Sequence, residues 1–434
     1  MLDSVWSCAA GFVCSAMDRR LEHIVISFFL AMLMIHGYVF WSVRDMVIAG
    51  YPDFTSFYGA GKTLRDGRGT QLYDAGEQWR VQQEFASRVR IRNAPLPYLR
   101  PPFEALLFVP LTLLPYSQAY LLWNAAGLCI ALGIPLLLRR RIEALRQFPS
   151  WLLVMLPLAF TPLFLALMQG QDSILLLLFY SLAYLALTKA EDFRAGCWLG
   201  LGLFKPQLVI PFAAILLLQG KRRVVLGFFS VAGVLFFVSV ALVGWSEIIR
   251  YPGYVWWLEQ HTGREVLPRD TPNLRGLAEG FCSGLVPTWA IILLVSVSSA
   301  AVVVWAAQRH SSIIGNGNRL TSLVFSQAMV ATFLVSYHAF GYDLIVMLLP
   351  IFLLIGFVLA NNWRASKWSD VALAGPIALL LFAPIFLLLW LPFHAMNLVA
   401  LVLLLWMWGM SRKISRLHAV IPPVQSGTHA IGVI

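Results

Sequence analysis

Asp53 is the side chain in this sequence with the clearest chemical potential. It follows a strongly apolar stretch, residues 24–41, inside the run Tyr51-Pro-Asp-Phe-Thr-Ser-Phe-Tyr58. A carboxylate just outside a first membrane span, at the head of a loop rich in aromatic residues and arginine, commonly acts as a counter-ion, a proton carrier or a catalytic base. The structural alternative is that Asp53 caps a juxtamembrane helix or pairs with a loop arginine.

Three further groups of polar side chains lie far apart along the chain. They are Gln169-Gly-Gln171-Asp172, Lys205 before Pro206, and His338 with Tyr342 and Asp343. Each group also has a structural explanation. The first could be a tight turn followed by a helix cap, Lys205 could be a snorkelling interfacial cation, and His338 could simply end a helix.

Taken together, these side chains suit a reaction between an anionic phospho-lipid substrate and an acceptor hydroxyl. A carboxylate such as Asp53 can take the acceptor proton as a general base. Lys205 and Arg100 can stabilise negative charge on a phosphate leaving group, and His338 can donate a hydrogen bond to that phosphate. The chain has no Walker loop, no H-E-x-x-H and no G-x-S-x-G with partners, so nucleotide-driven transport and hydrolase chemistry gain no support.

The composition predicts that membrane helices position these groups. Of the 434 residues, 59% are hydrophobic and 12% are charged, against about 25% charged in a soluble domain. The net charge of +11 is spread in short basic clusters at the ends of apolar runs, which is typical of topology signals and not of nucleic-acid binding. The five cysteines form no CxxC pair and indicate neither a disulfide framework nor a metal site.

Apolar runs long enough to cross a bilayer, about 20 residues each, predict an all-α polytopic protein with about twelve transmembrane helices. Placing Arg19-Arg20 and the later basic clusters inside makes 101–115 a juxtamembrane segment and splits 196–219 into two short spans that meet at Phe204-Lys-Pro206. This threading brings all four polar groups to the outer face. The candidate spans are 23–43, 117–138, 150–168, 172–188, 196–219, 224–244, 287–307, 320–338, 342–360, 370–391 and 393–411.

The domain organisation follows from this threading. Residues 1–22 are expected to be a cytosolic or interfacial segment, 23–411 a single transmembrane domain, and 412–434 a cytosolic tail. Two long outer loops, 44–116 and 245–286, are expected to carry short juxtamembrane helices, because loops of this length in a compact protein are commonly functional.

Six short motifs in this order resemble glycosyltransferase family 87 of the GT-C superfamily, over roughly residues 40–360. They are Asp53 with Phe57-Tyr58-x-Ala60, Gly67-x-x-x-x-Leu72-Tyr73-Asp74, Arg100-Pro-Pro-Phe-Glu-Ala, Gly170-Gln171-Asp172-Ser173, Phe204-Lys205-Pro206-Gln207, and Ser336-Tyr-His338-x-Phe-x-Tyr342-Asp343-Leu. Many relatives carry Asn where this chain has Asp172, so the added negative charge would need neutralising by Lys205 or an arginine.

The resemblance implies an inverting transfer of a hexosyl group, commonly mannosyl, from a polyprenyl-phosphate carrier to an acceptor on the extracytoplasmic side of the cell membrane. Asp53 would be the general base. Donor binding would fall to Lys205, His338, Arg100 and Gln171, with support from Tyr58, Asp172, Tyr342 and Asp343. The implied partners are the lipid-linked donor, a glycan or glycolipid acceptor and the bilayer, with no nucleic acid.

Three expectations remain open from the sequence. No two carboxylates share a loop motif with a histidine at ligand spacing, and a monophosphate donor can be neutralised by Lys and Arg, so we expect no metal and no other cofactor. A transporter or flippase of a lipid-linked glycan is one alternative function. A non-enzymatic envelope assembly protein, in which Asp53 would be dispensable, is the other.

Overall fold

Long helices form from the apolar segments because, in lipid, every backbone polar group must be satisfied within the structure itself. The computed structural model describes residues 19–87, 94–261, 267–308, 319–360 and 368–420, which contain helices and loops but no β-strand. Six of the described helices are long and apolar enough to cross a membrane. They are α2 (Arg19–Ile48), α5 (Tyr116–Arg139), α12 (Arg222–Val243), α15 (Thr288–Ala307), η7 with α17 (Asp343–Met347 and Leu348–Ala360), and η8 with α20 (Met396–Leu398 and Val399–Val420).

Two further apolar segments are bent. Helix α7 (Ser150–Ala159) meets α8 (Thr161–Gln169) at 60°, and the bend between α18 (Trp368–Leu380) and α19 (Ala383–Trp390) is 70°. Both second halves begin with a proline in the first turn, where its missing N–H costs no intrahelical bond. Counting each bent pair as one span gives up to eight spans in the described chain. The all-α polytopic architecture is confirmed, and the count of twelve stays a prediction.

Shorter helices account for the remaining predicted spans. They are α9 (Ser173–Thr188), α10 (Asp192–Leu201), α11 (Pro206–Leu218) and α16 (Arg319–Val335). The short helix α6 (Glu143–Arg146) lies in the connection between α5 and α7. The predicted break at Phe204-Lys-Pro206 is present, because a 3-10 turn, η4 (Gly202–Phe204), separates α10 from Lys205 and α11. Helix α20 continues to Val420, past residue 411, where the tail was expected to begin.

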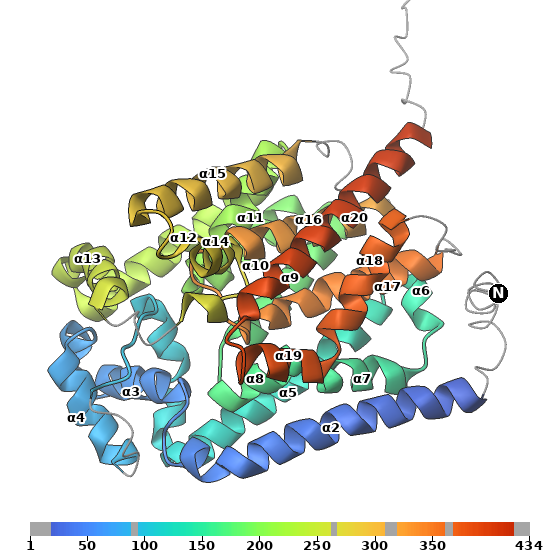
Figure 1. The fold of residues 1–434 in the computed structure, drawn as a ribbon. Helices are drawn as coiled ribbons and strands as arrows, with labels where there is room; N and C mark the ends of the chain where they lie inside the picture. The colour runs from blue at the N-terminus through green and yellow to red at the C-terminus, as the bar shows by residue number, and fades with distance from the viewer. Residues whose placement is uncertain (1–18, 88–93, 262–266, 309–318, 361–367, 421–434) are drawn as a thin grey trace, which may run out of the picture.

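Short helices also occupy both predicted outer loops. The first holds α3 (Phe54–Arg65), η1 (Gly69–Gln71), α4 (Ala75–Ala86), η2 (Pro102–Leu107) and η3 (Pro110–Leu113); the second holds α13 (Trp245–His261), η6 (Pro268–Asp270) and α14 (Leu274–Cys282). In Figure 1, α3, α4 and α13 gather at one end of the bundle, α2 runs along its lower side, and α15 lies across its upper left part. The two loops therefore form one cap over one end of the helices.

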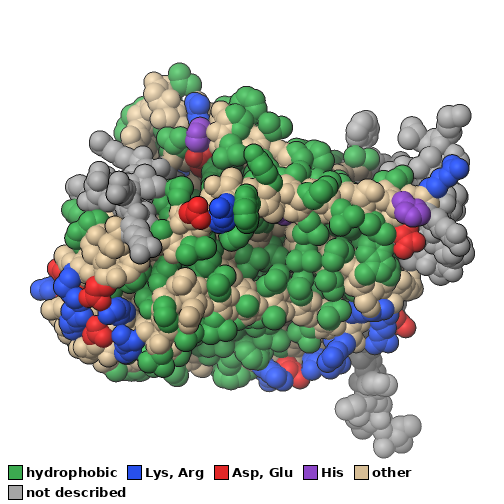
Figure 2. Space-filling view, turned by 90° about the horizontal axis from the view of Figure 1, so that it is seen from below, with side chains coloured by type: hydrophobic (Ala, Val, Ile, Leu, Met, Phe, Trp, Pro, Cys, Tyr) green, Lys and Arg blue, Asp and Glu red, His purple; other side chains and the backbone are tan. Residues whose placement is uncertain are grey.

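The surface is divided as a lipid-embedded protein requires. Large apolar side chains such as Met34, Tyr38, Phe229 and Phe237 are exposed on α2 and α12. Figure 2 shows a broad apolar surface with a dense group of charged side chains at its left end and further charged side chains toward its right end. The left end carries α3 and α4, whose cations and carboxylates pair with each other, as Lys62 does with Glu84 at 2.6 Å. Apolar residues facing outward along whole helices are the expected contact with lipid chains.

Candidate active site

Asp53 lies at the start of α3 but does not cap it. Its carboxylate makes no capping hydrogen bond to the first turn of that helix. Instead Oδ2 accepts a hydrogen bond of 2.7 Å from Nε2 of Gln171, while the backbone N–H of Asp53 donates to Oε1 of Gln169 at 3.1 Å. Two glutamines of one turn therefore fix the position of a half-buried carboxylate, which leaves it in reach of a ligand.

That turn depends on Gly170. It ends α8 in the left-handed conformation, with φ of 62°, which glycine adopts without steric cost. A Cβ at this position would come within 2.7 Å of the Cβ of Phe54, so the turn also needs glycine for space. Nε1 of Trp123 donates to the Gly170 carbonyl at 2.9 Å and holds the turn against α5. The predicted tight turn is confirmed, and it serves to aim Gln169 and Gln171 at Asp53.

Lys205 is completely buried, so it is not a snorkelling interfacial cation. It occupies the break between η4 and α11, and its Nζ lies 2.8 Å from Oδ1 of Asp172 and 2.5 Å from Oδ1 of Asp343. The hydroxyl of Ser173 and Oε1 of Gln171 are also within hydrogen-bond distance, at 2.5 and 3.2 Å. An ammonium has three N–H donors, so the protein itself satisfies this cation.

Asp172 is paired with two cations. Besides Lys205, the guanidinium of Arg100 approaches it, with Nε 3.3 Å from Oδ2. The two cations that contact Asp172 are therefore available to neutralise the negative charge that it adds to the site.

Arg100 is held in place through its backbone as well as its side chain. Its carbonyl accepts a hydrogen bond from the Tyr73 hydroxyl at 2.8 Å, and the preceding carbonyl, of Leu99, accepts one from Tyr251 at 2.8 Å. These tyrosines come from the first and the second outer loop. Nη2 of Arg100 also donates to Oε1 of Gln171 at 3.3 Å. The side chain of Arg100 remains 14% exposed, unlike that of Lys205.

Glu104 is a member of the network that sequence analysis did not select. It is fully buried beside Asp172, and it accepts a hydrogen bond of 3.2 Å from the Tyr98 hydroxyl. Burial, together with the negative charge of Asp172, holds the pKa of Glu104 well above its ordinary value. Burial and the neighbouring negative charge therefore favour the protonated form of Glu104 over the carboxylate.

The raised pKa of Glu104 predicts a pH effect on stability. A carboxyl whose pKa is raised by folding stabilises the protein fully below its unfolded pKa, about 4.3, and this contribution is lost as pH rises toward the folded pKa. Glu104→Gln keeps a neutral hydrogen-bond donor and removes the titration. Between pH 5 and pH 8 we expect the melting temperature of the purified wild type in detergent to fall more steeply than that of Glu104→Gln.

If the melting temperatures of the wild type and of Glu104→Gln changed equally between pH 5 and pH 8, the pKa of Glu104 would not be raised in the folded protein.

The segment 338–343 completes the network from the far end of the sequence. Oδ2 of Asp343 accepts the backbone N–H of Phe340 at 3.0 Å, so the carboxylate both folds its own loop and binds Lys205. Nε2 of Gln207 donates to the His338 carbonyl at 3.1 Å, which joins this loop to α11. The His338 ring is half-buried against Phe340, with ring centroids 4.6 Å apart.

Tyr342 lies against the cation of the network. Nζ of Lys205 is 5.3 Å from the centre of the Tyr342 ring. Tyr342 therefore joins the network through its contact with Lys205.

The structure does not place Tyr58 with these groups. Its hydroxyl donates to the Leu114 carbonyl at 2.8 Å, and its ring packs in an aromatic cluster with Phe54, Phe85 and Tyr116. This cluster lies beneath α3 and supports the start of the helix that carries Asp53. Tyr58 therefore contributes to the position of the site through packing.

The described residues contain no group of three or more His, Cys, Asp or Glu side chains arranged to hold a metal ion. At the centre of the network, the ammonium of Lys205 lies between two carboxylates. Chemically, the arrangement offers a half-buried carboxylate, Asp53, next to an arginine that ligands can reach, Arg100. Both are tied to the same glutamine, Gln171.

Comparison with known proteins identifies the sequence pattern behind this site. The sequence model of glycosyltransferase family 87 matches residues 98–336, more than half of the chain. The matched range includes Arg100, Gln171, Asp172 and Lys205, whereas Asp53 and the segment 338–343 lie outside it. No curated protein and no solved structure matches the chain.

Proposed function

Because the chain belongs to glycosyltransferase family 87 and is a multi-pass membrane protein, we propose that it transfers a hexosyl group from a polyprenyl-phosphate carrier to an acceptor hydroxyl. The sugar we propose is mannose, and the acceptor is a glycan or glycolipid. The reaction would take place on the extracytoplasmic face of the cell membrane, at the end of the bundle capped by the two outer loops.

The observation that carries this proposal is the position of Asp53. Its carboxylate is half-buried, makes no capping bond to α3, and is oriented by Gln171, whose amide oxygen in turn contacts Arg100 and Lys205. A general base needs a fixed position within hydrogen-bond reach of the proton that it removes. The hydrogen bonds of Asp53 with Gln169 and Gln171 supply that fixed position.

In the proposed reaction, Asp53 accepts the proton of the acceptor hydroxyl while the acceptor oxygen attacks the anomeric carbon. The bond from that carbon to the phosphate oxygen breaks, and the electron pair leaves with the polyprenyl phosphate. Attack from the face opposite to the leaving group inverts the anomeric configuration. The products are the glycosylated acceptor, the carrier phosphate and a protonated Asp53, which returns its proton to water.

The two cations have different proposed roles. Arg100 is 14% exposed and can contact the donor phosphate, whose negative charge grows as the bond breaks. Lys205 is fully buried and already bound by Asp172 and Asp343, so we assign it to holding the network together. His338, half-buried on the neighbouring loop, can donate a hydrogen bond to the phosphate.

Transfer from a radiolabelled polyprenyl-phosphate mannose, with the purified protein in detergent and a membrane glycolipid extract as acceptor, tests the function. We expect radiolabel to move from the lipid carrier to the acceptor fraction. Failure with mannose and success with another polyprenyl-phosphate hexose would correct the sugar. Failure with every polyprenyl-phosphate sugar, together with carrier movement across liposome bilayers, would favour a flippase.

We also propose that transfer is independent of metal ions. A monophosphate leaving group can be stabilised by Arg100 and by hydrogen bonds, whereas Mg²⁺ commonly accompanies diphosphates. The transfer rate should therefore be unchanged after treatment with excess EDTA. Loss of transfer in EDTA, with recovery on adding Mg²⁺ or Mn²⁺, would instead make Asp53 a candidate metal ligand.

A further inference from the structure

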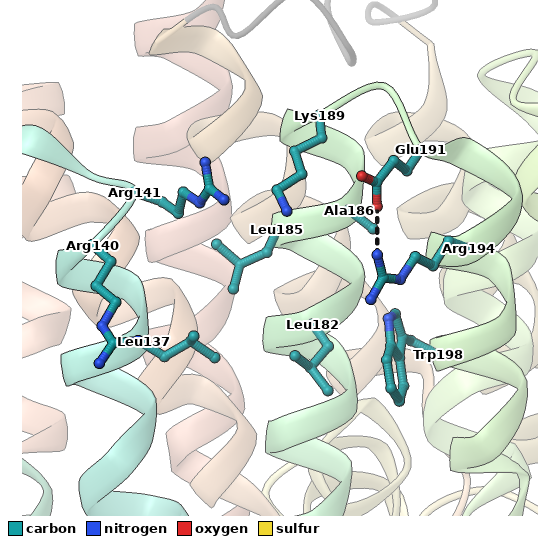
Figure 3. A pocket seen from close by; sticks show the side chains of 10 residues that line it. All are labelled: Leu137, Arg140, Arg141, Leu182, Leu185, Ala186, Lys189, Glu191, Arg194 and Trp198. Atoms are coloured by element: carbon teal, nitrogen blue, oxygen red, sulfur yellow. Dashed lines mark hydrogen bonds and ion pairs between the residues drawn. The ribbon is translucent and has the colours of Figure 1, made fainter.

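A second site lies at the other end of the bundle. A cavity of about 440 Å³ opens between the last turns of α5 and α9 and the first turns of α10 (Figure 3). This volume is within the range of small-molecule binding sites. Its lining residues are Leu137, Arg140, Arg141, Leu182, Leu185, Ala186, Lys189, Glu191, Arg194 and Trp198.

The cavity is separate from the Asp53 site. Helix α9 begins at Ser173, which hydrogen bonds to Lys205, and Lys189 follows directly after its last residue. The 16 residues of this helix span about 24 Å at 1.5 Å per residue. The cavity is thus at the opposite end of the same helices, on the side that the basic clusters assign to the cytoplasm.

The charge of the cavity is strongly positive. Four cations and one carboxylate line it, and that carboxylate, of Glu191, is paired with Arg194 at 3.1 Å. Within the described residues, the side chains of Arg140, Arg141 and Lys189 have no hydrogen-bond or ion-pair partner. In Figure 3 the Arg141 guanidinium and the Lys189 ammonium lie on either side of Leu185. Three uncompensated cations around one hollow favour an anionic ligand.

Helix ends explain only part of this pattern. Cations near helix C-termini stabilise the helix dipole, which accounts for one basic residue at the end of α5 and one at the end of α9. It does not account for Arg194, which lies in the first turn of α10, where the dipole disfavours a cation. Nor does it explain why three elements direct cations to one cavity.

The rest of the lining is apolar. Leu137, Leu182, Leu185 and Trp198 form the wall that continues from the cations along the helices, as Figure 3 shows. A ligand that matches both parts carries an anionic head and an apolar chain. Basic pockets between transmembrane helices on the cytoplasmic side commonly bind the phosphate head groups of anionic lipids.

We propose that this cavity binds the phosphate head group of an anionic phospholipid of the cytoplasmic leaflet, with the first part of an acyl chain against Leu182 and Trp198. Arg140, Arg141 and Lys189 would contact the phosphate. This site is independent of the proposed glycosyl transfer, because none of its residues belongs to the Asp53 network.

Native mass spectrometry of the purified protein with added phosphatidylglycerol or phosphatidylcholine tests the proposal. We expect phosphatidylglycerol to bind at least about tenfold more tightly than phosphatidylcholine, and we expect Arg141→Gln with Lys189→Gln to reduce this preference to about twofold or less, since each cation near a lipid head group contributes about fivefold in affinity. The matched control is Arg222→Gln with Arg223→Gln. Arg222 and Arg223 are exposed at the same end of the bundle as the cavity but do not line it. Their substitution removes the same charge as the Arg141 and Lys189 substitutions.

An equal loss of affinity in both double variants would overturn the proposal, because it would indicate general surface charge. So would an equal affinity of the wild type for the two lipids. Millimolar inorganic phosphate without lipid should raise the melting temperature in detergent less than phosphatidylglycerol does; an equal rise would assign the cavity to a soluble phosphate. Lys189→Arg replaces the side chain but keeps its charge, so it should keep the lipid preference. This result would show that the glutamine variants lose lipid binding through the lost charge and not through a loss of folding.

Discussion

Asp53→Asn is expected to abolish glycosyl transfer while leaving the protein folded. The substitution keeps the size of the side chain, and an amide oxygen can still accept the hydrogen bond from Nε2 of Gln171. It removes the group that takes the acceptor proton, and loss of a general base typically costs about 10²–10⁴-fold in rate. The measurement is the transfer rate with labelled donor, alongside the melting temperature of the purified variant.

The matched control for this variant is Asp45→Asn. Asp45 lies in the last turn of α2, eight residues before Asp53, and its side chain is 86% exposed, so this change should leave transfer within about twofold of the wild type. If Asp53→Asn retained near wild-type activity, the catalytic assignment would be lost. A fall in melting temperature matching the fall in activity would assign Asp53 a structural role.

The largest expected effect on stability is that of Lys205→Met. This change removes the cation between Asp172 and Asp343 and leaves Asp343 buried without its ion-pair partner. Breaking a buried ion pair by removing one partner typically costs about 3–5 kcal/mol. We expect a melting temperature in detergent well below that of the wild type, together with low expression.

Two comparisons separate this effect from the loss of a surface charge. Lys221→Met breaks a longer ion pair, with Asp192 at 3.5 Å, whose side chains are 15% and 20% exposed, and should cost about 1 kcal/mol, less than Lys205→Met. Adding Asp343→Asn to Lys205→Met removes the unpaired carboxylate and should restore part of the lost stability. Equal melting temperatures for Lys205→Met and Lys221→Met would mean that the buried network contributes little.

The sequence was sufficient to predict those features that depend on local composition. Apolar runs bounded by arginines predict the long helices, and the break at Lys205-Pro206 follows from a proline that starts α11. Short helices in the two outer loops were also predictable. The threading predicted one common face for Asp53, Gln171, Asp172, Lys205 and Asp343, and the structure brings these side chains together.

The partners within that area could not be predicted. Lys205 was expected to meet a donor phosphate, but the fold buries it between two carboxylates that lie far apart in the sequence. In the sequence, Glu104 looks like any glutamate four residues after an arginine, and only the fold shows that it is buried beside Asp172, which raises its pKa. Hydrophobic periodicity reports which face of a helix is buried, not which side chain lies opposite.

The broken segment around Lys205 also constrains how the chain is made. Ribosomes deliver α9 with Asp172 first and Lys205 soon afterwards, whereas Asp343 lies 138 residues further on. A chain that has been synthesised only as far as α11 therefore already contains Lys205 and Asp172, which lie 2.8 Å apart in the finished fold and can neutralise each other. Neutralising Lys205 thus does not require Asp343, which belongs to the last third of the protein.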